Sequence, residues 1–309
     1  MRRDIEFNAE GTILRGWLYL PDGADRGRSP VIVMAHGFTA VKEQYLDRFA
    51  EVFVATGLAV LVFDHRNFGA SDGEPRQEVD PVQQMRDYRH AITYARTVPE
   101  LDHERLGVWG TSFSGGHVLI VGAVDRRVRC VVSQVPGVNG PVSASRRTRP
   151  DLVSALLARY DADRDQRFAG ARPATIAVVA EDQSMPCALP GLDSWMFFEG
   201  SRRDMAPSWR NEVTLRSAEM MRENEPTVWV ARISPTPLLM IVATEDMLTP
   251  TDLALETYNR ALEPKKLVLI PGGHFEPYTG SGFEISSAAA RDWFVQHLLT
   301  RSGEHRSTS

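Results

Sequence analysis

The sequence predicts an α/β protein built on a mostly parallel, doubly wound β-sheet. Residues 31–34, 58–63 and 238–242 form continuous apolar runs, which indicate strands that are buried on both faces. Segments in which apolar residues recur with helical spacing separate such runs. This alternation is typical of a parallel sheet covered by helices on both faces, with functional loops at the carboxyl ends of the strands.

The first half of the chain supplies the opening elements of this sheet. Residues 5–20 alternate between apolar and polar around Gly11, which predicts an antiparallel hairpin. The apolar residues that predict a helix between the next two strands are Leu46, Phe49, Val52 and Phe53. Gly57 is a suitable stop for that helix, and Asp80 with Pro81 can cap and begin the next one, whose apolar stripe starts at Val82.

The later elements continue the same alternation. They are a strand at 105–110, a helix at 113–124, a strand at 128–132, the strand at 238–242, a helix starting near 249–252, a strand at 266–270 and a last helix around Trp293.

The chain of 309 residues is long enough for one large core with an insertion. We expect residues 1–136 and 233–300 to form the core. Residues 137–232 differ in composition and interrupt the pattern between the sixth and seventh predicted strands, which favours a lid (cap) over the site. The polar tail, residues 301–309, is predicted to be disordered.

The composition limits which binding partners and which cellular compartment we expect for this protein. The net charge is −5, and the basic residues form no long stripe, so we expect no nucleic-acid partner. No apolar run reaches membrane-spanning length and the first residues lack a signal-peptide pattern, which predicts a cytoplasmic protein with no membrane partner. Cys130 and Cys187 are expected to be reduced, and a homodimer remains open.

The segment Gly110–Gly116 predicts a sharp turn between a strand and a helix, with Ser112 at the turn. Such a turn exposes the serine hydroxyl and leaves the next backbone amide facing the same space, as acyl transfer requires. Ser114 offers a rival register, but the strand ends at Gly110 and the turn must follow immediately, which favours Ser112. A phosphate-binding turn is disfavoured because no dinucleotide or Walker pattern is present.

A serine nucleophile needs a base and a carboxylate that orients the base. Asp246 and His274 each follow a predicted strand, as Ser112 does, so all three are expected at one edge of the sheet. Glu245 and Asp252 are the competing carboxylates, and Asp252 could serve only as a helix cap. Taken alone, His274 could be an ordinary surface-loop histidine.

With these motifs, the chain resembles the α/β-hydrolase superfamily of serine hydrolases, and most closely its dienelactone-hydrolase-like and polyketide-transferase-like members. The segments 36–38 and 64–73 fit the resemblance as well. It implies Ser112 as nucleophile, His274 as base and Asp246 as its partner. It also implies an oxyanion hole formed by the backbone N–H groups of Phe38 and Phe113.

No metal or cofactor is expected. His36 and His65 lie near the site in sequence but lack the spacing of a metal centre, so we expect structural hydrogen bonding from them.

Apolar residues in the lid could form the lid's own core or the ceiling of a substrate pocket. The candidates for pocket residues are Trp195, Phe198, Trp209, Met220, Trp229 and Tyr278. Phe197 and Met221 belong to the same apolar set. The arginine clusters 146–149 and 202–203 could attract an anionic group of a substrate or could be solvated surface.

The sequence therefore predicts a cofactor-independent serine hydrolase that cleaves an ester, thioester, lactone or activated amide of a small apolar molecule through an acyl-enzyme. Acyl transfer on the same three residues is the first alternative. A ligand-binding protein without activity is the second, and lyase or isomerase chemistry on this scaffold also stays open.

Overall fold

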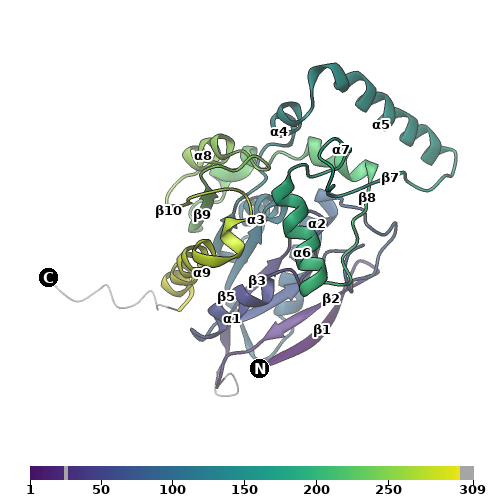
Figure 1. Ribbon diagram of the computed structural model, residues 1–309. Helices are drawn as coiled ribbons and strands as arrows, with labels where there is room; N and C mark the ends of the chain where they lie inside the picture. The colour runs from purple at the N-terminus through teal and green to yellow at the C-terminus, as the bar shows by residue number, and fades with distance from the viewer. Residues whose placement is uncertain (24–26, 300–309) are drawn as a thin grey trace.

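The computed structural model describes residues 1–23 and 27–299. Its centre is an eight-stranded β-sheet (Figure 1). The strand order is β1-β2-β4-β3-β5-β6-β9-β10. The strands are β1 (Arg2–Ala9), β2 (Thr12–Tyr19), β3 (Ser29–Ala35), β4 (Ala59–Phe63), β5 (Leu101–Thr111), β6 (Val128–Gln134), β9 (Leu238–Ala243) and β10 (Lys265–Ile270). β2 pairs antiparallel with β1 and β4, and all other neighbours are parallel, which confirms the predicted sheet. The tail, 301–309, lies outside the described residues.

Helices cover both faces of this sheet. The helices against one face are α2 (Pro81–Ala95), α3 (Phe113–Val124) and α8 (Thr251–Arg260), and those against the other are α1 (Leu46–Val54) and α9 (Gly280–Phe294), which continues into a π-helix, Val295–Leu299. The side chains of β4 alternate between the two cores. Leu61 and Phe63 join the first, and Val60 and Val62 join the second. The doubly wound arrangement is therefore confirmed.

Local signals place the helix ends. The Asp80 side chain accepts hydrogen bonds from the backbone N–H groups of Val82 and Gln83, and so caps α2 as expected. Gly57 adopts a φ of 95° three residues beyond α1, a conformation that suits glycine. Val82 differs from the prediction because its side chain is exposed, whereas Pro81 and Gln84 of the same turn are buried.

A long insertion separates β6 from β9. Its elements are α4 (Gly140–Arg147), a 3-10 turn (Pro150–Leu152), α5 (Val153–Phe168), β7 (Thr175–Ile176), α6 (Leu192–Asp204), β8 (Val213–Thr214), α7 (Leu215–Glu223) and a 3-10 helix (Pro226–Arg232). The strand-like run 175–179 forms only the two-residue β7. The backbone N–H groups of Val178 and Val179 both donate to Asn211 Oδ1, which replaces a continued strand ladder.

The insertion is docked on the sheet through its own apolar cluster. Val178, Phe198 and Trp209 of the insertion pack there with Phe38 and Phe113, which lie at the carboxyl ends of β3 and β5. Helix α5 extends outward, away from the sheet (Figure 1). The insertion therefore covers the edge where the loops that follow the strands converge.

Close packing at the end of β5 requires glycine. A Cβ at Gly110 would lie 2.1 Å from the Ser114 carbonyl oxygen, and one at Gly116 would lie 2.3 Å from the Gly137 carbonyl oxygen. Both contacts are with backbone, which cannot rotate away. The turn from β5 into α3 can therefore approach its neighbours this closely only without side chains at these positions.

We predict that Gly110→Ala lowers the free energy of unfolding by about 3 kcal/mol, because its methyl group overpacks against backbone. Urea denaturation measures the change. Gly200→Ala is the matched control, since a Cβ there meets nothing within 4 Å. In α6 that substitution should stabilise by about 0.5–1 kcal/mol. Equal effects at the two positions would contradict the packing argument.

Candidate active site

Ser112 lies at the turn between β5 and α3, with a strained backbone of φ 56° and ψ −120°. The end of β6 and the loop that follows it hold the turn. The Ser112 N–H donates to the Gln134 carbonyl at 2.9 Å, and the Gly137 N–H donates to the Ser112 carbonyl at 3.0 Å. These bonds anchor the backbone, so the side chain is free to face the cavity described below.

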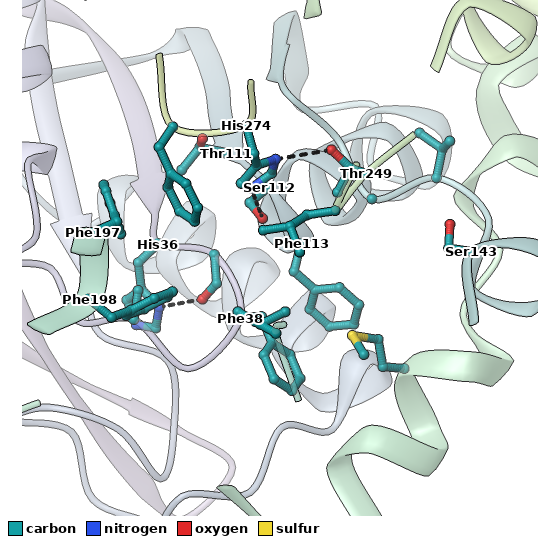
Figure 2. A pocket seen from close by; sticks show the side chains of 18 of the residues that line it. His36, Phe38, Thr111, Ser112, Phe113, Ser143, Phe197, Phe198, Thr249 and His274 are labelled. Carbon is teal, nitrogen blue, oxygen red and sulfur yellow. Dashed lines mark hydrogen bonds between the residues drawn. The ribbon is translucent and has the colours of Figure 1, made fainter. Parts of the chain in front are cut away.

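The structure brings Ser112, His274 and Asp246 into one hydrogen-bonded chain. Ser112 Oγ lies 3.0 Å from His274 Nε2 (Figure 2). On the other side of the ring, His274 Nδ1 lies 2.7 Å from Asp246 Oδ2. His274 and Asp246 are buried. The competing carboxylates lie elsewhere, since Glu245 is exposed and Asp252 pairs with Arg146 on the surface.

The Asp246 carboxylate is held by several donors. Its Oδ1 accepts the backbone N–H groups of Leu248, at 2.9 Å, and Thr249, at 2.8 Å. Burial raises the pKa of Asp246, but the charge of His274, its hydrogen bond and the donors of Thr249 outweigh burial and hold the pKa below its ordinary value. Asp246 is therefore a stable anion beside the imidazole.

Thr249 is a residue of this site that the sequence reasoning missed. Its hydroxyl lies 2.8 Å from Asp246 Oδ2, 3.2 Å from His274 Nδ1 and 3.0 Å from the Val135 carbonyl oxygen. In the sequence Thr249 looked like part of a helix cap, but α8 begins at Thr251 and has no side-chain cap. The only available signal was its position three residues after Asp246.

Phe38 and Phe113 flank the Ser112 side chain, as the resemblance implied. The N–H of Phe113 is the first of α3, and no acceptor for it or for the N–H of Phe38 is found between residues 1–23 and 27–299. Gly37 lets the Phe38 loop come close, because a Cβ there would lie 2.8 Å from Ser112 Cβ and 3.3 Å from Ser112 Oγ. Two free donors thus lie beside the hydroxyl.

Ser114, the rival register, has a different environment. It is buried, and its hydroxyl donates to the His36 carbonyl at 2.5 Å and lies 2.9 Å from His65 Nε2. His36 Nε2 in turn accepts the backbone N–H of His65 at 3.2 Å. Burial lowers the pKa of both histidines. They are neutral rings that tie strand ends together.

A buried ion pair anchors the loop that follows β3. Lys42 Nζ lies 2.7 Å from Asp64 Oδ2, and the Lys42 backbone N–H donates to Asp64 Oδ1 at 2.7 Å. Both side chains are almost fully inaccessible to solvent. Removing one partner of such a pair leaves a buried charge uncompensated, so the pair fixes the loop that carries Phe38.

A cavity opens beside Ser112 and is bounded by both the core and the insertion (Figure 2). Of the proposed pocket residues, Phe198 and Tyr278 lie on its wall. The sequence did not single out Leu189, Arg147, Ser143 or Asn139 as pocket residues, and it left Phe197 and Met221 among the undecided lid residues; all six also line it.

Four proposed pocket residues do not line the cavity. Trp209 stacks behind Phe198, with ring centroids 5.0 Å apart, and Trp195 packs into the same apolar cluster. Trp229 packs against the hydrophobic core that includes the residues of α3, and the Arg232 guanidinium lies over its ring. Met220 is displaced by Met221, because consecutive positions on α7 point about 100° apart.

Neither a metal cluster nor a membrane span is found in the described part of the chain. Between residues 1–23 and 27–299, no three histidine, cysteine, aspartate or glutamate side chains gather closely enough to bind a metal ion. No helix in that part is both long and apolar enough to cross a bilayer.

A strained serine turn at a strand end, backed by a histidine and an aspartate, defines the class of α/β proteins with a hydrolase-type site. Residues 30–280 match the family model of the alpha/beta hydrolase fold. The chain therefore belongs to the α/β-hydrolase family.

Characterised relatives carry several different names. The chain is 32% identical over 289 residues to a thiohydrolase of Eupenicillium brefeldianum, covering 92% of this chain and 91% of the relative. It is 33% identical over 286 residues to the quorum-quenching protein AidA of Acinetobacter baumannii, covering 91% and 90%. The crystal structure of GrgF from Penicillium sp. sh18 superposes with a TM-score of 0.83 at 28% identity, covering 97% of this chain and all of that one. GrgF of Penicillium is named a polyketide transferase.

We predict that Asp246→Asn destabilises the protein by about 2 kcal/mol at pH 7, because it removes a charge-assisted hydrogen bond. The folded-state pKa is depressed, so this contribution is complete above the unfolded-state value of about 3.9 and is lost as the pH falls through the folded value. The difference from wild type should shrink below about pH 4. Urea denaturation across pH measures it, and a constant difference would contradict the electrostatic origin.

Proposed function

We propose that the protein is a serine hydrolase that cleaves an ester, thioester, lactone or activated amide of a small, largely apolar substrate. The observation that carries the proposal is the continuous chain from Ser112 Oγ through His274 to Asp246, at 3.0 Å and 2.7 Å. Hydroxyl, imidazole and carboxylate in this order are the parts that activate serine as a nucleophile.

In the acylation step, Ser112 Oγ attacks the substrate carbonyl carbon while His274 Nε2 takes the hydroxyl proton. Asp246 keeps the other ring proton on Nδ1 and stabilises the imidazolium that forms. The carbonyl oxygen becomes an oxyanion, which the N–H groups of Phe38 and Phe113 bind. Collapse of this intermediate breaks the bond to the leaving group, which receives its proton from His274.

In the second step, water attacks the acyl-enzyme and gives a proton to His274. The C–O bond to Ser112 then breaks, Ser112 recovers its proton, and the carboxylic acid leaves. Apolar walls around the cavity, among them Phe197, Phe198 and Met221, fit the carbon skeleton of the acyl group.

We assign residues 137–232 the role of a lid and the flanking residues that of the catalytic core. The insertion contributes Leu189, Phe197 and Phe198 to the cavity wall, so the space beside Ser112 is bounded from both sides. A lid of this kind excludes bulk water and selects the acyl group.

Acyl transfer is the second candidate, favoured by the name of the Penicillium relative. The first step is the same, and an alcohol or amine replaces water in the second. The relatives' names support chemistry of either kind on this fold.

A fluorophosphonate probe tests the nucleophile. We expect one label per chain, on the peptide that contains Ser112, and no label in Ser112→Ala, because the Ser112 hydroxyl lies 3.0 Å from His274 Nε2 and both residues line the cavity. The Ser114 hydroxyl also lies near an imidazole, His65, but it is buried and donates to the His36 carbonyl. Ser143→Ala should keep the label, since Ser143 lines the same cavity with no imidazole beside it. Mass spectrometry of the digested protein gives the position, and a label on Ser114 or persistence in Ser112→Ala would refute the assignment.

Product partition tests hydrolysis against transfer. With an aryl ester substrate and increasing methanol or butanol, we expect the free acid to remain the main product, with at most a share of ester in proportion to alcohol concentration. Chromatography of the products measures the ratio. An acceptor alcohol that yields mostly ester at millimolar concentration would show that transfer, and not hydrolysis, is the reaction.

A further inference from the structure

A second cavity adjoins the cavity beside Ser112, and Arg147 and Met221 line both. Three arginines from three different helices line the second cavity: Arg147 of α4, Arg159 of α5 and Arg222 of α7. No aspartate or glutamate is among its lining residues. A positively charged compartment is therefore attached to the apolar one.

These arginines lack acidic partners. In residues 1–23 and 27–299, no carboxylate oxygen lies within 4.0 Å of any of the three guanidinium groups. Arg147 Nη1 donates only to the Leu248 carbonyl, at 3.2 Å, and Arg222 Nη1 only to Thr148 Oγ1, at 3.5 Å. No hydrogen bond of Arg159 is found in that part of the chain.

Arginines next to them in sequence behave differently. Arg146 forms a two-pronged ion pair with Asp252, and Arg149 forms one with Asp151, both on the exposed surface. Within this stretch, the arginine that lines the second cavity therefore lacks an acidic partner, whereas its neighbours on the surface have one. Arginines whose donors are left free in a cavity are suited to bind carboxylate or phosphate.

The charge of Arg222 acts on Arg147, and all three positive charges act on Tyr160. Burial lowers the pKa of Arg147, and Arg222 lowers it further. Burial raises the pKa of the Tyr160 phenol, which the charges of Arg222, Arg159 and Arg147 oppose. Positive charges held this close repel one another, and a bound anion relieves that repulsion.

We propose that the second cavity is an anion-binding subsite of the same active site, which holds a phosphate or carboxylate group that is covalently part of the acyl substrate. Arg147 lines both cavities, so one substrate molecule can place its anionic group in the second cavity and its acyl group beside Ser112. Three arginines match a dianionic phosphate in charge better than a single carboxylate. This inference rests on the proposed function.

Two matched substrate pairs test the subsite and separate the two sources of charge. Butyryl-S-4′-phosphopantetheine and butyryl-S-pantetheine differ only by the phosphate. The mono-p-nitrophenyl ester of glutaric acid and p-nitrophenyl valerate differ by a carboxylate in place of a methyl group. For at least one pair we expect kcat/KM to be about 10- to 100-fold higher for the anionic member.

Arginine variants test whether the preference for the anionic substrate comes from the second cavity. Arg222→Gln and Arg159→Gln should each reduce the ratio of kcat/KM, anionic over neutral, by about 10-fold. Arg149→Gln is the matched control, since it removes the same charge from the neighbouring cluster but its side chain pairs with Asp151 outside the cavity. It should leave the ratio unchanged. A loss shared by all three variants would indicate a general charge effect and would overturn the subsite.

A binding measurement separates this inference from the proposed function. Calorimetry on Ser112→Ala, which needs no turnover, should detect 4′-phosphopantetheine or glutarate, and pantetheine should bind at least 10-fold more weakly than its phosphate. Turnover of the neutral substrates with no preference for either anion, and no binding difference, would refute the subsite and leave the hydrolase intact. Binding of the anion without any turnover would refute the hydrolase and leave the subsite.

Discussion

The strained backbone at Ser112 is the constraint on which the rest of the site depends. A positive φ at a non-glycine residue costs about 1–3 kcal/mol and persists only where surrounding contacts enforce it. Hydrogen bonds to β6 and to Gly137 enforce it here, and Gly110 lets the turn pack against the backbone of Ser114. The side chain consequently faces His274 and the cavity without any rearrangement on substrate binding.

The same turn is coupled to the loop after β3 by buried polar groups. Ser114 lies two residues after Ser112 and donates to the His36 carbonyl, while the Lys42–Asp64 pair holds the far end of that loop. Both ends of the segment that carries Phe38 are therefore fixed relative to Ser112. Donors that are already in position need no reorganisation as charge develops, which is the basis of electrostatic catalysis.

The sheet and the meeting of Ser112, His274 and Asp246 could be predicted because both follow from the order of strands and loops. Continuous apolar runs mark buried strands, and parallel strands bring their carboxyl ends to one edge, so Ser112, Asp246 and His274 meet there. The insertion obeys no such rule. Whether Met220 or Met221 faces the cavity depends on how α7 docks, which tertiary contacts decide. The sequence reasoning missed Thr249 because its hydroxyl binds the Asp246 side chain and does not cap a helix.

The insertion begins after β6 and ends before β9, and these two strands are hydrogen-bonded to each other. A segment tethered at a single place can gain, lose or exchange helices during evolution while the strand order and the residues beneath it stay as they are. The insertion and the sheet that carries Ser112 are thus encoded by separable stretches of the gene. Members of the family can then differ in substrate preference while the reaction that they perform stays the same.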